Sequence, residues 1–170
     1  MTKRITLFSA ILASSAFMFT GAANASPETA EDWGARASVL YGMTAKFLNT
    51  SAPVGNSQLE AEYLEGLTQF AIIAGRLAVW VDTSGGAKDF GCIYRGMAEE
   101  AELQLESLET ASTQADATAA LTRIATMLDD AQSIAVASAH AARTGTSTLE
   151  TSYCPASAIP LDTYLTGHGS

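Results

Sequence analysis

Large apolar residues recur at intervals of three and four in four segments of this chain, and no stretch alternates convincingly between apolar and polar residues. Such intervals place side chains on one face of an α-helix, whereas a half-buried strand needs alternation with period two. The spacing predicts helices over about 26–48, 57–83, 89–112 and 113–143. Because Pro53 and Gly55 follow the first segment and Ser84-Gly85-Gly86 follows the second, we expect an all-α fold, an antiparallel four-helix bundle with short loops, over residues 26–144.

Capping patterns mark the ends of these helices. Ser-Pro-Glu at 26–28 places a capping hydroxyl, a proline and an acid where a helix begins. Ser57 followed by Glu60 matches a capping box for the second helix. Gly145, after the last periodic residues of the fourth segment, is a typical C-terminal stop.

The second segment is apolar around most of its circumference. Opposite its main stripe it carries Ile72, Ile73, Val79 and Trp80. A helix of this kind is central or forms an interface, so we expect these four residues to form a homodimer contact. The run from 67 to 81 is too short for a membrane span and contains a charged arginine.

Glutamates form a stripe on the third segment. On a helical wheel the four lie within about 80° of one another, opposite the apolar face; they are Glu99, Glu102, Glu106 and Glu109. A solvated acidic face is the preferred interpretation, with binding of a divalent cation or a basic partner as the alternative. Because the Glu-x-x-His motif of di-metal bundles is absent, we expect no metal site and no cofactor.

Residues 1–25 have the organisation of a cleaved signal peptide. Two basic residues at 3–4 precede an apolar stretch at 5–19, and Ala-Asn-Ala follows at 23–25. This order matches the n-region, h-region and small-residue cleavage site of an exported protein. A membrane anchor is the alternative, but the stretch is shorter than the roughly 20 residues of a span. We expect cleavage after residue 25, a periplasmic or secreted protein, and no stable membrane insertion afterwards.

The charge of the chain excludes two classes of partner. The chain has 9 basic and 18 acidic residues, a formal charge of −9. Loss of Lys3 and Arg4 leaves 7 basic residues against the same 18 acids, hence −11 for the mature domain. Because nucleic acids and anionic lipid surfaces both recruit Lys and Arg, we expect neither as a partner.

Cys92 and Cys154 are the only cysteines, and in an oxidising compartment such a pair is most simply a disulfide. Closing a loop of this length contributes roughly 4 kcal/mol in the chain-entropy model. The bond would tether an irregular tail, residues 145–170, whose main part we expect to pack on the bundle and whose end we expect to be disordered. A reactive thiol, or a zinc site completed by His140 and His168, is a less favoured alternative because the spacings are unsuitable.

Two arginines lie in apolar surroundings, Arg76 within the most apolar segment and Arg95 beside an aromatic residue. A guanidinium near a core needs a carboxylate partner, and Glu99 is one turn ahead of Arg95. Structural ion pairs, or arginines that extend their charge to solvent, are the preferred interpretation. The functional alternative is an anion-binding pocket lined by Tyr63, Arg76, Trp80, Tyr94 and Arg95.

No local pattern of a catalytic nucleophile, phosphate-binding loop or zinc protease occurs in the chain. The leading hypothesis is therefore an exported, non-catalytic helical bundle that acts through protein–protein contacts or small-ligand binding. An enzyme or redox-active protein that uses Cys92 or a non-local acid pair is one alternative. A periplasmic stress chaperone is another.

Overall fold

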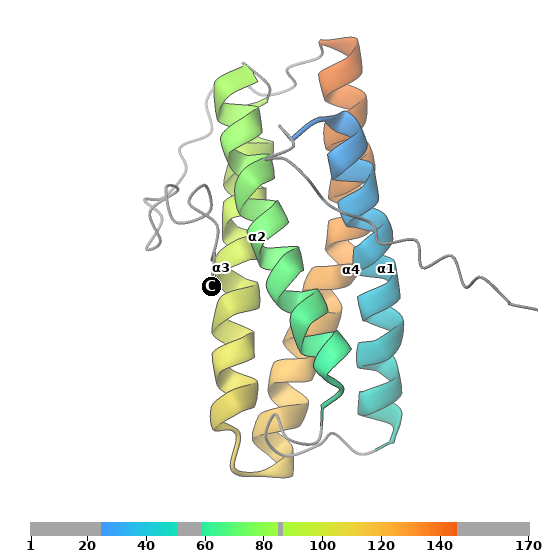
Figure 1. The fold of residues 1–170 in the computed structure, drawn as a ribbon, viewed down its shortest axis with the longest axis vertical. Helices are drawn as coiled ribbons and strands as arrows, with labels where there is room; N and C mark the ends of the chain where they lie inside the picture. Colours follow the sequence, from blue (N-terminus) through green and yellow to red (C-terminus); the bar gives the residue numbers. More distant parts are fainter. Residues whose placement is uncertain (1–24, 51–58, 85–86, 146–170) are drawn as a thin grey trace, which may run out of the picture.

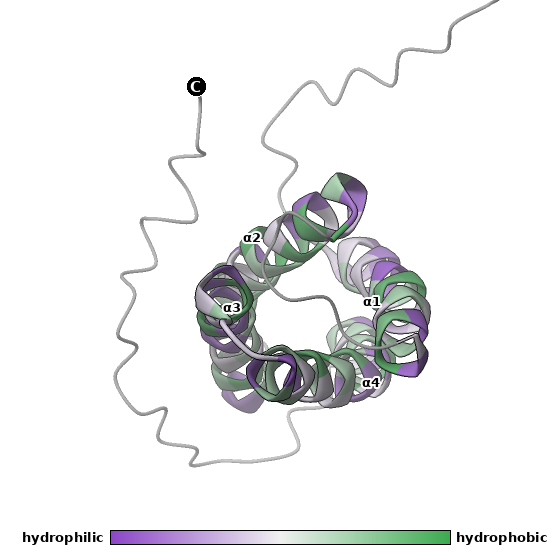
Figure 2. Ribbon diagram, turned by 90° about the horizontal axis from the view of Figure 1, so that it is seen from below, coloured by the Kyte–Doolittle hydropathy of each residue, from purple (hydrophilic) through white to green (hydrophobic). Residues whose placement is uncertain are grey.

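The computed structural model describes residues 25–50, 59–84 and 87–145. These residues form four α-helices and no strand: α1 (Pro27–Asn49), α2 (Ala61–Ser84), α3 (Lys88–Thr110) and α4 (Gln114–Thr144). Consecutive helices run in opposite directions (Figure 1) and follow one another around a common axis (Figure 2). The predicted all-α bundle of four helices is thereby confirmed.

Helix α1 begins where the sequence predicts. The Ser26 hydroxyl oxygen accepts a hydrogen bond from the backbone N–H of Thr29 at 3.2 Å, and Pro27 occupies the first helical position. Proline there lacks only an N–H that would have no partner within the helix. The acid of the first turn, Glu28, lies at the positive end of the helix dipole, which favours it.

Helix α2 begins later than predicted. The Glu60 carbonyl accepts hydrogen bonds from the N–H groups of Tyr63 and Leu64 at 3.0 and 3.3 Å, so Glu60 lies just before the helix. A capping-box glutamate would be the third helical residue; here the Glu60 carboxylate instead lies 3.4 Å from Lys46 Nζ of α1. The predicted capping box is therefore wrong as the start of α2, and Ser57 lies outside the described residues.

Helix α4 has a strong signal at each end. The Thr113 hydroxyl accepts from the Asp116 N–H at 3.2 Å, and the Asp116 carboxylate accepts from the Thr113 N–H at 3.2 Å, which completes a capping box. At the other end Gly145 has φ 67°, in the left-handed region that glycine adopts without steric cost. The predicted stop at Gly145 is confirmed.

One layer of the core joins all four helices. The Trp33 indole of α1 stacks on Phe70 of α2 with ring centroids 4.6 Å apart, and its N–H donates to the Phe70 carbonyl at 3.0 Å. Tyr94 of α3 meets the same indole edge-on at 5.2 Å. The Tyr94 and Ser138 hydroxyls are hydrogen-bonded to each other, which brings in α4. All four side chains are buried.

The helices pack as two close pairs, α1 with α4 and α2 with α3. A Cβ on Gly34 of α1 would lie 2.5 Å from the Ala135 Cβ of α4, and one on Gly91 of α3 would lie 2.7 Å from Asp82 Oδ1 of α2. Among neighbouring helices, α1 and α2 make the fewest contacts. Accordingly, α2 crosses the bundle obliquely, from beside α1 to beside α3 (Figure 1).

Among the described helices, only α2 is long and apolar enough to cross a membrane by length and composition. Buried core helices of soluble proteins pass the same test. Nine residues of α2 are buried within the bundle, from Tyr63 to Val81. Much of its apolarity therefore serves the core.

Several predictions concern parts of the chain outside the described residues. These parts are residues 1–24 of the expected signal peptide and the tail from residue 146 onward, with Cys154 and His168. The cleavage, the packing of the tail and the Cys92–Cys154 disulfide therefore stay predictions.

The close approach of α1 and α4 gives a test of the fold. Gly34→Ala should lower the free energy of unfolding by about 1–3 kcal/mol, because its methyl group would overlap the Ala135 methyl group. Gly42→Ala, in the same helix with nothing within 4 Å of the added Cβ, should raise it by up to about 1 kcal/mol. Urea unfolding followed by circular dichroism measures both. Equal effects of the two substitutions would contradict this packing.

Candidate functional site

Two members of the predicted binding pocket, Tyr63 and Tyr94, lie in the core. Both rings are fully buried. The Tyr63 hydroxyl is 2.8 Å from the hydroxyl of Thr44, which in turn donates to the Leu40 carbonyl. Burial raises the pKa of each tyrosine to about 12, so both phenols are neutral at physiological pH. Their hydroxyls are already hydrogen-bonded, and the predicted five-residue pocket is therefore not assembled around them.

Arg95 fits the structural alternative. Its guanidinium Nη2 lies 2.8 Å from Asp82 Oδ2 on α2, and only 13% of its side chain is exposed. The sequence pointed to Glu99 as its partner, whereas the ion pair found here joins two helices. Gly91 makes room for this link, because a Cβ there would overlap the Asp82 carboxylate. Arg95 therefore fastens α3 to α2.

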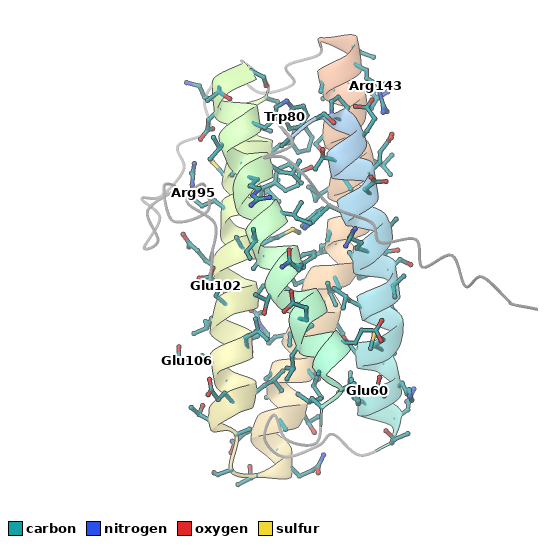
Figure 3. The ribbon with its side chains drawn as sticks, viewed as in Figure 1. Glu60, Trp80, Arg95, Glu102, Glu106 and Arg143 are labelled. Atoms are coloured by element: carbon teal, nitrogen blue, oxygen red, sulfur yellow. The ribbon has the colours of Figure 1, made fainter. Side chains whose placement is uncertain are left out.

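The four apolar residues predicted as an interface divide between two sides of α2. Ile73 and Trp80, seven residues apart, pack partly against the core. Ile72 and Val79, also seven residues apart, are half-buried without being among the side chains that pack on the core. Figure 3 shows Trp80 on the side of α2 toward α1 and α4, away from Arg95 on the outer side of α3.

Arg76 lies between these two apolar sides of α2. It is half-buried, and its guanidinium makes no ion pair or hydrogen bond with any residue that the structure describes. A guanidinium in this position is attracted to any carboxylate or carbonyl that approaches from outside. We define the α2 outer face as Ile72, Arg76 and Val79.

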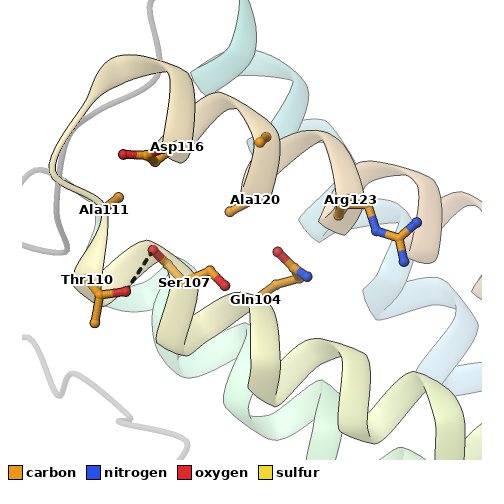
Figure 4. Close-up of a pocket in the computed structure, with 8 residues that line it drawn as sticks. Gln104, Ser107, Thr110, Ala111, Asp116, Ala120 and Arg123 are labelled. Carbon is orange, nitrogen blue, oxygen red and sulfur yellow. Dashed lines mark hydrogen bonds between the residues drawn. The ribbon is translucent and has the colours of Figure 1, made fainter.

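A groove between α3 and α4 is a feature that the sequence did not predict. Figure 4 shows its lower part, lined by Gln104, Ser107, Thr110, Ala111, Asp116, Ala119, Ala120 and Arg123. Arg123 Nη2 lies 2.9 Å from Glu100 Oε1 and bridges the two helices, and a second hollow with Met97 and Met127 begins beyond it. Helical periodicity identifies which residues face inward but not how closely two helices approach, so no sequence signal marks this groove.

The groove combines neutral hydrogen-bonding side chains with two charged ones, Arg123, which is paired with Glu100, and Asp116, whose carboxylate accepts from the Thr113 N–H. The Ser107 hydroxyl donates to the Leu103 carbonyl of its own helix at 2.8 Å, and Gln104 Nε2 donates to Glu100 at 3.2 Å. Among the described residues no group of three His, Cys, Asp or Glu side chains could hold a metal ion. The groove can therefore receive a polar group but presents no uncompensated charge of its own at Arg123.

The two buried tyrosines predict a loss of stability at alkaline pH. Because the folded-state pKa of about 12 lies above the unfolded value near 10, their contribution is complete below pH 10 and is lost as pH rises toward 12. The decline is at most about 1.4 kcal/mol per pH unit for each tyrosine. Tyr63→Phe and Tyr94→Phe should each make it shallower in urea unfolding from pH 8 to 11.5. An unchanged slope in both variants would exclude these residues as its origin.

No protein family model matches the chain, and no curated protein or solved structure is significantly similar to it. A functional assignment consequently rests on the surfaces of this molecule alone. Of the five residues predicted to bind, two belong to the core and Arg95 to an interhelical ion pair. Trp80 packs partly against the core, and Arg76 is half-buried on α2 and makes no ion pair with any residue that the structure describes.

Proposed function

We propose that this protein is an exported, non-catalytic helical module that acts through protein–protein contact at the α2 outer face. The observation that carries the proposal is Arg76, a half-buried guanidinium without an ion pair among the described residues, next to Ile72 and Val79. Arginine beside apolar groups is typical of residues that dominate binding energy in protein interfaces. A partner that supplies a carboxylate there would gain a desolvated, charge-assisted hydrogen bond.

The other outward arginines described are a poorer basis for recognition: Arg36 is exposed on α1 and not half-buried as Arg76 is, and the other two are ion-paired. Arg123 and Arg143 are each held by glutamates, Arg143 by Glu28 at 3.1 Å and also by Glu31. A ligand at either site would have to compete with an existing ion pair. Small-ligand binding in the α3–α4 groove is for this reason the second choice, and the α2 outer face the first.

The start of α1 is where the expected cleavage meets the described fold. Ser26 is the N-cap of α1, and the expected cleavage falls between Ala25 and Ser26. Cleavage there would leave the capping hydroxyl and the whole helix in the mature protein. The expected processing is thus compatible with an intact bundle in the periplasm or outside the cell.

Reversing one charge on the α2 outer face tests the proposal. The tagged protein, expressed in its own cells and cross-linked, should capture a specific protein that Arg76→Glu depletes about tenfold or more, as expected for losing about 1.4 kcal/mol of binding. Quantitative mass spectrometry of the captured proteins measures this change.

Arg36→Glu on the exposed surface of α1 is the matched control and should leave the captured proteins unchanged. The stability of Arg76→Glu should stay within about 0.5 kcal/mol of the wild type, because no described partner of Arg76 is lost. The same proteins at the same yield with Arg76→Glu would refute contact at this face.

A further inference from the structure

The outer surface of the α2–α3 pair carries apolar side chains that lack a cover among the described residues. On α2 these are Ile72 and Val79; on α3 Leu103 is 54% exposed. Because α2 and α3 are antiparallel, and Gly91 lies opposite Asp82, Ile72 and Leu103 stand within about one helical turn of the same height. An added Cβ on Gly96 of α3 would meet nothing within 4 Å. We define the α2–α3 outer surface as Ile72, Val79, Gly96 and Leu103.

Cys92 lies at one end of this surface. Cys92, Gly96, Glu99 and Leu103 follow one another at intervals of four, three and four residues, which places them on one side of α3. Cys92 and Glu99 are each engaged in an interaction, so this side of α3 is not bare. A segment attached at Cys92 would begin at the edge of the apolar side chains.

The chain beyond α4 is long enough to reach Cys92 and continue along this surface. α4 ends at Gly145 at the same end of the bundle as the start of α3, its neighbour (Figures 1 and 2). The nine residues from 146 to 154 span up to about 30 Å, several times the 8–10 Å between packed helix axes. Residues 155–170 then extend up to about 50 Å, whereas Cys92 to Leu103 covers only about 16 Å of helix.

The composition of residues 155–170 complements this surface. The segment contains Ile159, Leu161, Tyr164 and Leu165, and two prolines that disfavour helix and favour an extended chain. Its only charged residue is Asp162, opposite in sign to Arg76. A second copy of the chain is a weaker occupant, because two mature domains at −11 repel each other, whereas a tethered segment is present at high effective concentration.

We propose that residues 155–170, tethered by a Cys92–Cys154 disulfide, lie along the α2–α3 outer surface and cover Ile72, Val79 and Leu103. This docking does not depend on the proposed function. When the Cys92–Cys154 bond forms, the two thiols together lose two protons and two electrons. The disulfide of a thiol oxidase in the exported compartment accepts them and is reduced to two thiols.

Photo-cross-linking of the purified, oxidised mature chain tests the docking. A benzophenone amino acid in place of Leu103 should join to peptides of residues 155–170 within one chain. The matched control is the same amino acid in place of Val136 on α4, which is 66% exposed and should give no such product. A C92S/C154S chain should lose about tenfold or more of the product from position 103, since the tether supplies the effective concentration.

Each other result contradicts the proposal. Products from position 103 that join two chains would assign the surface to a second copy. Equal yields from positions 103 and 136, or no product with 155–170 at either position, would show that the segment does not dock there. Because no partner protein is present, these results are independent of whether Arg76 contacts one.

Discussion

The stacking of Trp33 on Phe70, with the indole N–H bonded to the Phe70 carbonyl at 3.0 Å, is the contact on which the bundle most depends. It joins α1 to α2, the neighbouring helices that otherwise make the fewest contacts. A helix carbonyl has a second lone pair, so it can accept this bond while it remains within its helix. Tyr94 packs on the same indole and reaches Ser138, which makes this layer common to all four helices.

This core has a consequence for where function can reside. The aromatic hydroxyls that the sequence offered for recognition hold the helices together: Tyr94 bonds Ser138 across α3 and α4, and Tyr63 bonds Thr44 across α2 and α1. A buried hydroxyl without a partner would be costly, so these pairs are required by burial itself. The proposed recognition therefore falls on an outer surface, where Arg76, between apolar neighbours, makes no ion pair with any residue that the structure describes.

Local rules succeeded at the start of α1 and at the end of α4. Ser26 caps α1 and Gly145 ends α4 because hydrogen bonds and φ angles within one turn decide both. The capping box at Ser57 failed although its pattern was correct, because Glu60 precedes the helix and turns its carboxylate to Lys46 of another helix. For Arg95, the sequence pointed to Glu99, one turn ahead in the same helix. The structure shows an ion pair with Asp82, which is thirteen residues away in sequence and lies on another helix.

The sequence by itself determined the class of fold, the number of helices and the strongest helix ends, since periodicity and capping are local properties of the chain. Only the tertiary structure decided which apolar residues of α2 belong to the core and which face outward, because the position of α2 between α1 and α3 sets that division. The tertiary structure also decided which arginines form an ion pair with a carboxylate. The partner of a charge is chosen by the approach of helices, as with Asp82 and Arg95, and no single-helix pattern records that approach.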